Sequence, residues 1–230
     1  MITFYAATGQ FKLCHTEMGA HPVVIINNKE CMLTPQEMLV WSALIWKIST
    51  KDEVQACYAQ RMKESGLQPT PTFDECLLRL ESRKLIKKAT NYIALDALYD
   101  LVCKLHIIPI EIDLPTTVIG ALRLALFRGV PVQRVWKQLK HQKLTPDERL
   151  VMSVAKQTSL TTAEIIKCIE RGRIDLDTDM KVLDALYDDD ATTCDNIHLS
   201  SYHAKSKPGV VQAVSNLYLK KLINFDVILE

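Results

Sequence analysis

The sequence predicts a mainly α-helical protein with small β elements, built from two tandem copies of one three-helix unit that a helical linker joins. The segment LTPQEMLVWSAL, which begins at Leu33, is echoed by LTPDERLVMSVA, which begins at Leu144. A second helix opening follows each segment, TKDEV in the first copy and TTAEI in the second. A third helical pattern covers residues 72–88 in the first copy and 209–225 in the second. Together these observations predict an internal duplication.

Each repeated segment predicts a capped helix. Thr34 is a good N-cap, Pro35 suits the first helical position, and Glu37 can close a capping box. The second copy repeats this arrangement with Thr145, Pro146 and Glu148. A capping box alone is common, so the duplication rests on the register that continues past it. The matched pairs at one constant offset are Thr50 and Thr161, Glu53 and Glu164, and Cys57 and Cys168.

The opening helix of the first copy is apolar on nearly every side between residues 38 and 48, whereas its counterpart in the second copy is amphipathic. A helix that is apolar all round must be buried all round. We therefore expect a cover for it: the N-terminal segment, the linker helices or another subunit. A homodimer through the first unit or the linker is consistent with this expectation.

Short β segments accompany the helices. The run KLIKKATNYIAL places two apolar stretches around Ala89, Thr90 and Asn91, which predicts a β-hairpin after the third helix. The run HPVVIINNKECML predicts a further strand of the same small sheet, with a turn at Asn27, Asn28 and Lys29. The second copy retains LINFDVILE, which predicts a single strand. Three helices followed by a hairpin form the plan of a winged helix-turn-helix domain.

The predicted boundaries follow from this plan. Residues 1–108 form an N-terminal winged-helix domain, 109–143 a basic helical linker, and 144–230 a C-terminal winged-helix-like domain with an acidic insertion at about 171–204. The linker has no Asp or Glu from residue 116 onward, and its basic residues suit either DNA or the snorkelling face of a packing helix. We predict a surface helix and an acidic loop in the insertion, which would offer a site for a protein partner.

The segments VVIINNKECMLTPQE and TFDECLLRLESRKL resemble the OmpR/PhoB-type effector domain of response regulators, in which a strand and turn lead into an LTPxE helix. The ending RLESRKLIKK is equally similar to MarR-type regulators. The resemblance covers about residues 23–95 and recurs weakly from residue 144. It implies a winged-helix regulator that places a third helix in the DNA major groove. No receiver-domain acidic cluster is found in the sequence, so phosphorylation control is not implied.

The two third helices differ as candidate DNA readers. Asp74, Glu75 and Glu81 on the first would repel phosphate, so we expect only its C-terminal end and the wing to contact DNA. The residues there are Arg83, Lys84, Lys87 and Lys88. The second helix is predicted to read bases, because Gln and Asn can bond adenine bidentately and Lys can reach phosphate or guanine. Its candidates are Gln212, Ser215, Asn216 and Lys220, preceded by Lys205 and Lys207. An ordinary solvated polar face is the alternative.

Composition narrows the function classes. The 28 Lys+Arg and 27 Asp+Glu leave a net charge of +1, so bulk charge argues neither for nor against nucleic acid. The seven cysteines include no CxxC, and the sequence has no signal peptide and no long apolar run, which predicts a cytoplasmic protein without membrane contact. No nucleotide, metal or nucleophile motif is found, so we expect neither catalysis nor a cofactor. Cys194, His198 and His203 are spaced too widely for a typical zinc site.

These observations predict a transcriptional regulator that binds double-stranded DNA through tandem winged helices. Two alternatives remain open. One is a winged-helix scaffold that binds other proteins, as in chromosome segregation, which the near-zero net charge and the acidic first reading helix would suit. The other is a replication initiator with two winged domains, for which a more basic chain would be expected.

Overall fold

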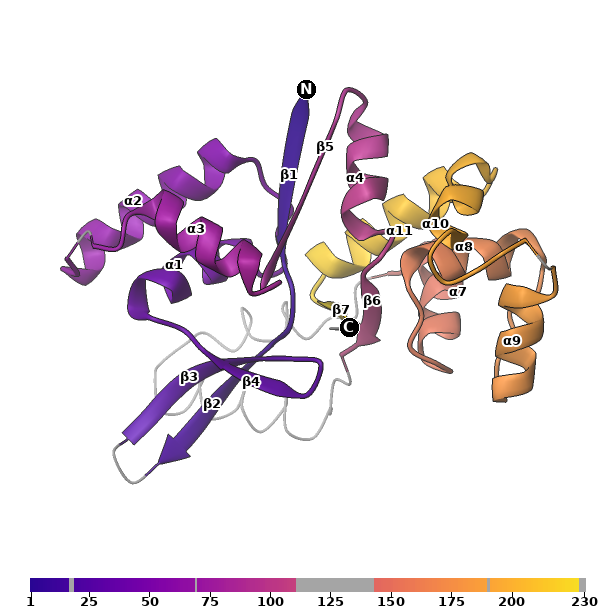
Figure 1. Ribbon diagram of the computed structural model, residues 1–230, viewed down its shortest axis with the longest axis horizontal. Helices are drawn as coiled ribbons and strands as arrows, with labels where there is room; N and C mark the ends of the chain where they lie inside the picture. The colour runs from indigo at the N-terminus through magenta and orange to yellow at the C-terminus, as the bar shows by residue number, and fades with distance from the viewer. Residues whose placement is uncertain (17–18, 69, 111–142, 190, 228–230) are drawn as a thin grey trace.

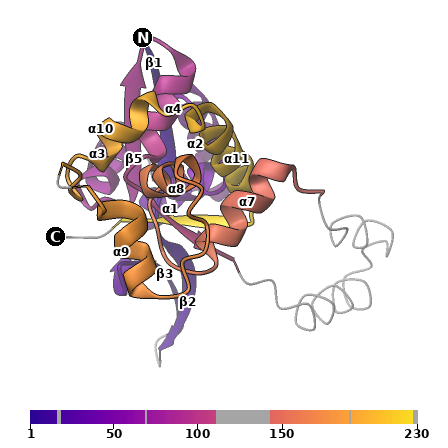
Figure 2. The same cartoon turned by 90° about the vertical axis from the view of Figure 1, so that its right-hand side faces the viewer.

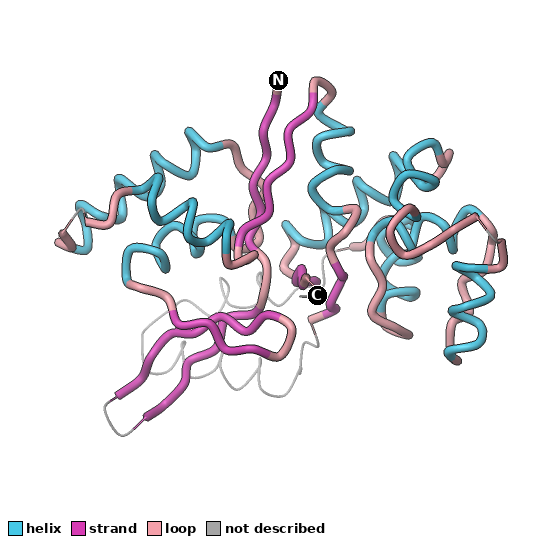
Figure 3. Tube along the Cα trace, viewed as in Figure 1, coloured by secondary structure: helices cyan, strands magenta, loops and turns pink. Residues whose placement is uncertain are grey.

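The computed structural model describes residues 1–16, 19–68, 70–110, 143–189 and 191–227. Two groups of helices lie on either side of a set of short strands near the middle of the molecule (Figures 1 and 3). The described strands form three small antiparallel sheets of two or three strands each. The predicted class, mainly helical with small β elements, is confirmed at this level.

The N-terminal unit consists of a strand, three helices and a second strand. β1 (Ile2–Ala7) precedes α1 (Pro35–Leu44), α2 (Lys51–Ser65) and α3 (Phe73–Ser82), and β5 (Ile86–Asn91) follows them. β5 pairs antiparallel with β1 along the full length of both strands. The apolar faces of the helices meet in one core, which includes Val40, Trp41, Leu44, Cys76 and Leu80.

The C-terminal unit repeats this order. β6 (His106–Pro109) precedes α7 (Pro146–Ala155) and α8 (Thr162–Glu170), while α11 (Lys207–Leu219) and β7 (Ile223–Asp226) follow. β7 pairs antiparallel with β6, as β5 does with β1. The insertion stands between α8 and α11 and contains α9 (Asp179–Tyr187), α10 (Ile197–Ser200) and the 3-10 turn Ser201–His203.

The two units also agree in detail. The predicted capping boxes are present, with Thr34 and Glu37 on α1 and with Thr145 and Glu148 on α7. In each unit the first strand bonds the segment that precedes the second helix: Tyr5 N to Ser49 O is 2.9 Å, and Ile107 N to Leu160 O is 3.0 Å. The turn after the third helix uses a left-handed lysine in both, Lys84 at φ 58° and Lys221 at φ 61°.

The predicted hairpin after α3 is wrong. β5 does not turn back at Asn91 but ends there, and the second apolar stretch forms the helix α4 (Ala94–Val102). Leu95, Leu98 and Val102 recur at i, i+3 and i+7, a helical rather than a strand spacing, and all three pack on one core. The strand partner of β5 comes instead from the N-terminus of the chain.

The Asn-rich turn is confirmed, but its sheet is a separate one. β3 (Gly19–Ile26) and β4 (Lys29–Met32) flank Asn27 and Asn28, whose φ angles of 46° and 58° suit a tight hairpin turn. Their third strand is β2 (Gln10–Thr16), not β1 or β5. The β2–β3 pair of this sheet extends away from the helices at the lower end of Figure 2, whereas the Asn27 amide donates to Asp226 Oδ1 at 3.1 Å.

The two units pack directly on each other. The Tyr218 hydroxyl of α11 lies 3.0 Å from Ala7 O and 3.2 Å from Leu44 O, and Trp46 Nε1 donates to Asn224 Oδ1 at 3.0 Å. Gly9 N donates to Phe225 O at 2.7 Å. The apolar segment 38–48 is therefore covered by α2, α3 and β1, and the C-terminal unit contacts its end at Leu44 and Trp46. The predicted linker lies almost wholly in residues 111–142, outside the described part of the chain.

Candidate nucleic-acid interface

The predicted reading helix α11 is enclosed by α4, α7 and α8. Ser215 is only 5% exposed, and its hydroxyl has no hydrogen-bond partner among the described residues. Gln212 is exposed and Asn216 is half-buried, and their side chains contact each other at 3.4 Å. The predicted open face is therefore wrong for Ser215, because the packing of α11 on its neighbours turns this position inward.

Lys220 makes an internal ion pair at the C-cap of α11. Its Nζ lies 2.6 Å and 2.8 Å from the two carboxylate oxygens of Glu148, which is fully buried. Burial alone would raise the pKa of Glu148, but the hydrogen bonds from Lys220 and from the Thr145 amide outweigh it, and the net pKa is lowered. The ammonium predicted to contact DNA is thus engaged with a carboxylate of the same unit.

Arg83 occupies the matching position in the N-terminal unit. It is the C-cap of α3, and its Nη1 lies 3.4 Å from Oε2 of the buried Glu37, the capping-box residue of α1. Its other terminal nitrogen donates to Met32 O at 2.6 Å. Both units therefore join the start of the first helix to the end of the third through a basic residue and a buried glutamate.

Lys207 also differs from its predicted role as a DNA contact. It is 8% exposed, its Nζ lies 2.8 Å from Asp96 Oδ1, and it sits 3.7 Å from the centre of the Tyr202 ring. The hydrogen bond from Lys207 is the largest cause that lowers the pKa of Asp96. This lysine joins α11 to α4 of the N-terminal half and has no open face to offer to a phosphate.

The remaining basic candidates are more accessible. Lys84 and Lys205 are exposed and Lys87 is half-buried, and none of the three makes an ion pair within the described residues. Lys88 is exposed, but its Nζ lies 2.6 Å from Glu81 Oε2. The turn after α3 therefore keeps part of the positive charge that the sequence predicted for it.

The exposed third helix is α3. Its inner face packs on α1 and β5, and its outer face is open. The carboxylates that argued against this helix have local partners. Asp74 pairs with Lys51 at 2.8 Å, Glu75 accepts from the amide of its N-cap Thr72 at 2.8 Å, and Glu81 pairs with Lys88. This leaves Leu78, Arg79 and Ser82 as open positions on the helix.

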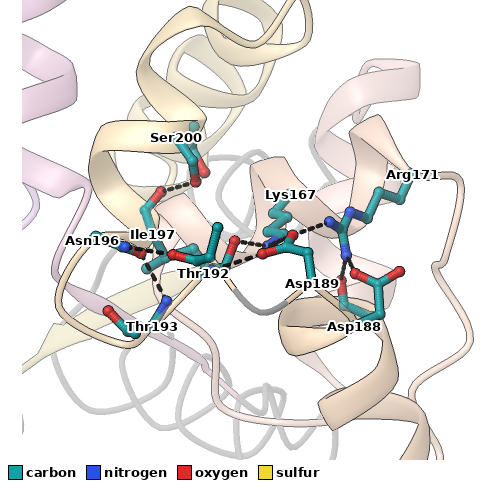
Figure 4. Close-up of polar contacts among 12 residues, drawn as sticks. Lys167, Arg171, Asp188, Asp189, Thr192, Thr193, Asn196, Ile197 and Ser200 are labelled. Carbon is teal, nitrogen blue, oxygen red and sulfur yellow. Dashed lines mark hydrogen bonds and ion pairs between the residues drawn. The ribbon is translucent and has the colours of Figure 1, made fainter.

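The acidic insertion is partly neutralised by its own unit, since Asp175, Asp177, Asp188 and Asp189 have ion-pair partners. Figure 4 shows Asp188 and Asp189 facing Arg171 and Lys167 of the α8 region. The Asp189 carboxylate lies 2.5 Å from Arg171 and 3.1 Å from Lys167, and hydrogen bonds from Thr192 are the first cause that lowers its pKa. Lys181 pairs with Asp175 and Asp177 at 2.7 Å each. α9 confirms the predicted surface helix, but much of the acidic charge is already paired.

Neither a metal site nor a membrane span is found in the described residues. No cluster of three or more of their His, Cys, Asp or Glu side chains could hold a metal ion. No described helix is long and apolar enough to cross a membrane. Cys194 is exposed, and its Sγ lies 3.1 Å from the Tyr187 hydroxyl.

The comparisons with known proteins were negative. No protein-family model, no curated protein and no solved structure matches this chain. Any functional assignment therefore rests on the residues and their geometry.

Arg79, on the open face of α3, was not among the residues that the sequence predicted to contact DNA. The carboxylates of α3 argued against this helix as a DNA reader, because the sequence does not show that Asp74 and Glu81 pair with Lys51 and Lys88. The spacing from Lys51 to Asp74 gives no sign of their contact, since α2 and a long connection separate them. The capping box TFDE, by contrast, did signal that Glu75 would be used locally.

Proposed function

We propose that the protein is a DNA-binding regulator of the winged-helix type that contacts duplex DNA through its N-terminal unit. In this proposal α2 and α3 form the helix-turn-helix, α3 faces the major groove, and the β1–β5 ribbon takes the place of the wing. The observation that supports it is the open outer face of α3, on which Asp74 and Glu81 are paired with lysines and Glu75 serves the capping box, and which leads into the exposed Lys84.

Within this proposal the contacts divide into two kinds. Arg79 is the exposed basic side chain of α3 and suits guanine or phosphate, while Lys84 suits phosphate alone. The C-terminal unit contributes at most its accessible residues Gln212, Asn216 and Lys205, because Lys207 and Lys220 serve internal ion pairs. This reverses the roles of the two third helices that the sequence favoured.

Binding to labelled random-sequence duplex DNA, followed by fluorescence anisotropy between about 50 mM and 200 mM salt, tests the proposal. Arg79→Ala and Lys84→Ala should each weaken binding and reduce the slope of log K against log salt by about 0.9 for each phosphate that the variant no longer neutralises. Lys156→Ala, which removes an exposed lysine of the C-terminal unit, is the matched control and should have a smaller effect. The assignment is refuted if the protein does not bind DNA, or if all three changes have the same effect on DNA affinity.

A protein-binding role for the same face is the second candidate. Leu78 is 68% exposed in the middle of the outer face of α3, where a DNA reader usually carries a polar side chain. Leu78→Ala should leave DNA affinity nearly unchanged if α3 reads DNA through Arg79. If the chain binds no DNA and Leu78→Ala abolishes its association with a purified partner protein, the scaffold role replaces the regulator role.

A further inference from the structure

A groove of about 530 Å³ lies where the two units and the insertion meet. One wall comes from the N-terminal unit, at the end of α3 and the start of β5, and a second from the residues between α4 and β6. The start of α8 and the loop before α10 close the other side. We call this the interunit groove. Its volume lies in the range of about 300–1,000 Å³ that is usual for small-molecule sites.

The lining of the interunit groove is apolar at its base and charged at its edge. The base includes the buried side chains of Ile86, Leu105 and Ile197, one from each wall. Small-molecule sites commonly combine such a base with a few converging polar groups. An apolar base of this kind offers nothing to a DNA phosphate, but it can accept the hydrocarbon part of a small ligand.

Positive charge at the groove comes from Lys84, Lys87 and Lys104. None of these lysines has a carboxylate within 4.0 Å among the described residues. They are therefore available to a ligand, whereas Lys207 and Lys220 of α11 are already paired. His106 and His198 also line the groove and can supply directional hydrogen bonds.

The carboxylates of the groove are less available than the lysines. Glu81 is paired with Lys88, and Glu164 accepts from the Thr161 amide at 2.7 Å and from its hydroxyl at 2.9 Å as the capping box of α8. Asp195, on the insertion side, is the one acidic lining residue without such a partner in the described residues. Among the described residues, three unpaired lysines therefore face two carboxylates without a cation partner, Glu164 and Asp195, so the unpaired charge at the groove favours an anion.

We propose that the interunit groove binds a small organic anion, whose acidic group is held by Lys84, Lys87 and Lys104 of the two lysine-bearing walls and whose apolar body rests on the base. Such a ligand would touch both units and the insertion at once. It would bind only the packed arrangement of the units and so stabilise it. The proposal does not depend on DNA binding. Its ligand differs from DNA in being small and in having an apolar body that rests on the base of the groove.

A pair of fluorescent probes tests this proposal on the full chain. 8-Anilinonaphthalene-1-sulfonate carries an acidic group on an aromatic body, and N-phenyl-1-naphthylamine is the same body without the sulfonate. The sulfonate probe should bind at one site per chain and more tightly than the neutral probe. The double variant Lys87→Met with Lys104→Met should weaken the sulfonate probe by about tenfold or more and the neutral probe by less than about twofold, because it removes two cations that only the sulfonate uses.

Lys156→Met is the control and should leave both probes unchanged, because that lysine is exposed away from the groove. Asp195→Asn provides an independent variant and should strengthen the sulfonate probe a few-fold. The proposal is overturned if binding is unsaturable, if the lysine changes weaken both probes equally, or if neither variant alters the sulfonate probe. It is also overturned if duplex DNA displaces the probe and the same lysine changes abolish DNA binding, which would assign these lysines to the DNA surface.

Discussion

The helices α3 and α11 occupy the same place in their units but have opposite surroundings. α3 packs on its own unit and leaves its outer face to solvent, with Leu78 68% exposed. α11 is enclosed by α4, α7 and α8, and Ser215, at the position that matches Leu78, is 5% exposed. The third helices of the two units therefore differ in burial. The outer face of α3 is exposed to solvent, whereas α11 is packed between other helices.

This difference also separates two kinds of basic residue. Charges on the turn after α3 remain partly free, whereas those on α11 stabilise the fold. Several changes that the sequence predicts to impair DNA binding should therefore change the free energy of unfolding instead.

The largest expected effect distinguishes Lys220 from Arg83. Lys220→Met leaves the fully buried Glu148 without its partner and should lower the free energy of unfolding by about 3–5 kcal/mol. Arg83→Met should lower the free energy of unfolding by about 1–2 kcal/mol, because the contact of Arg83 with Glu37 is longer and the guanidinium is a third exposed. Urea unfolding curves measure both.

Lys156→Met changes an exposed lysine that has no ion pair in the described residues. The free energy of unfolding of this variant should stay within about 0.5 kcal/mol of the wild-type value. Equal costs for Lys220→Met and Arg83→Met would remove the proposed contrast between the units. A Lys220→Met protein that unfolds like the wild type but binds DNA more weakly would restore the role the sequence predicted.

The next effect concerns the contact between α11 and α4. Lys207→Met should lower the free energy of unfolding by about 2–3 kcal/mol, since it leaves Asp96 unpaired and removes the cation from the Tyr202 ring. Adding Asp96→Asn should recover part of that loss, and a double-mutant cycle in urea measures the coupling. Additive losses would mean that the two side chains do not interact in solution.

The smallest effect has the opposite sign. Ser215→Ala removes a buried hydroxyl that has no partner in the described residues, and it should raise the free energy of unfolding by about 1 kcal/mol. Leu78→Ala at the matching exposed position should change it by less than about 0.5 kcal/mol. Thermal unfolding of the two variants gives the comparison, and a destabilised Ser215→Ala protein would show that its hydroxyl has a partner after all.

Local chemistry in the sequence determined the helix starts and the repeated order of elements. Each Thr-x-x-Glu box forms within four residues, so its geometry depends on no distant contact. The Asn27–Asn28 turn was predictable for the same reason, because short asparagine side chains tolerate the left-handed conformation. Each of these features is set by the chain within a few residues of itself.

The tertiary structure decided which polar residues are free. Lys220 meets Glu148, Lys207 meets Asp96, and Asp74 meets Lys51 across long stretches of sequence that no local pattern connects. The same holds for β5, which pairs with the N-terminal strand instead of a neighbouring one. Sequence by itself determined that two helical units exist and where their helices begin. Only the tertiary packing decided which third helix faces solvent, because burial depends on what the rest of the chain brings against it.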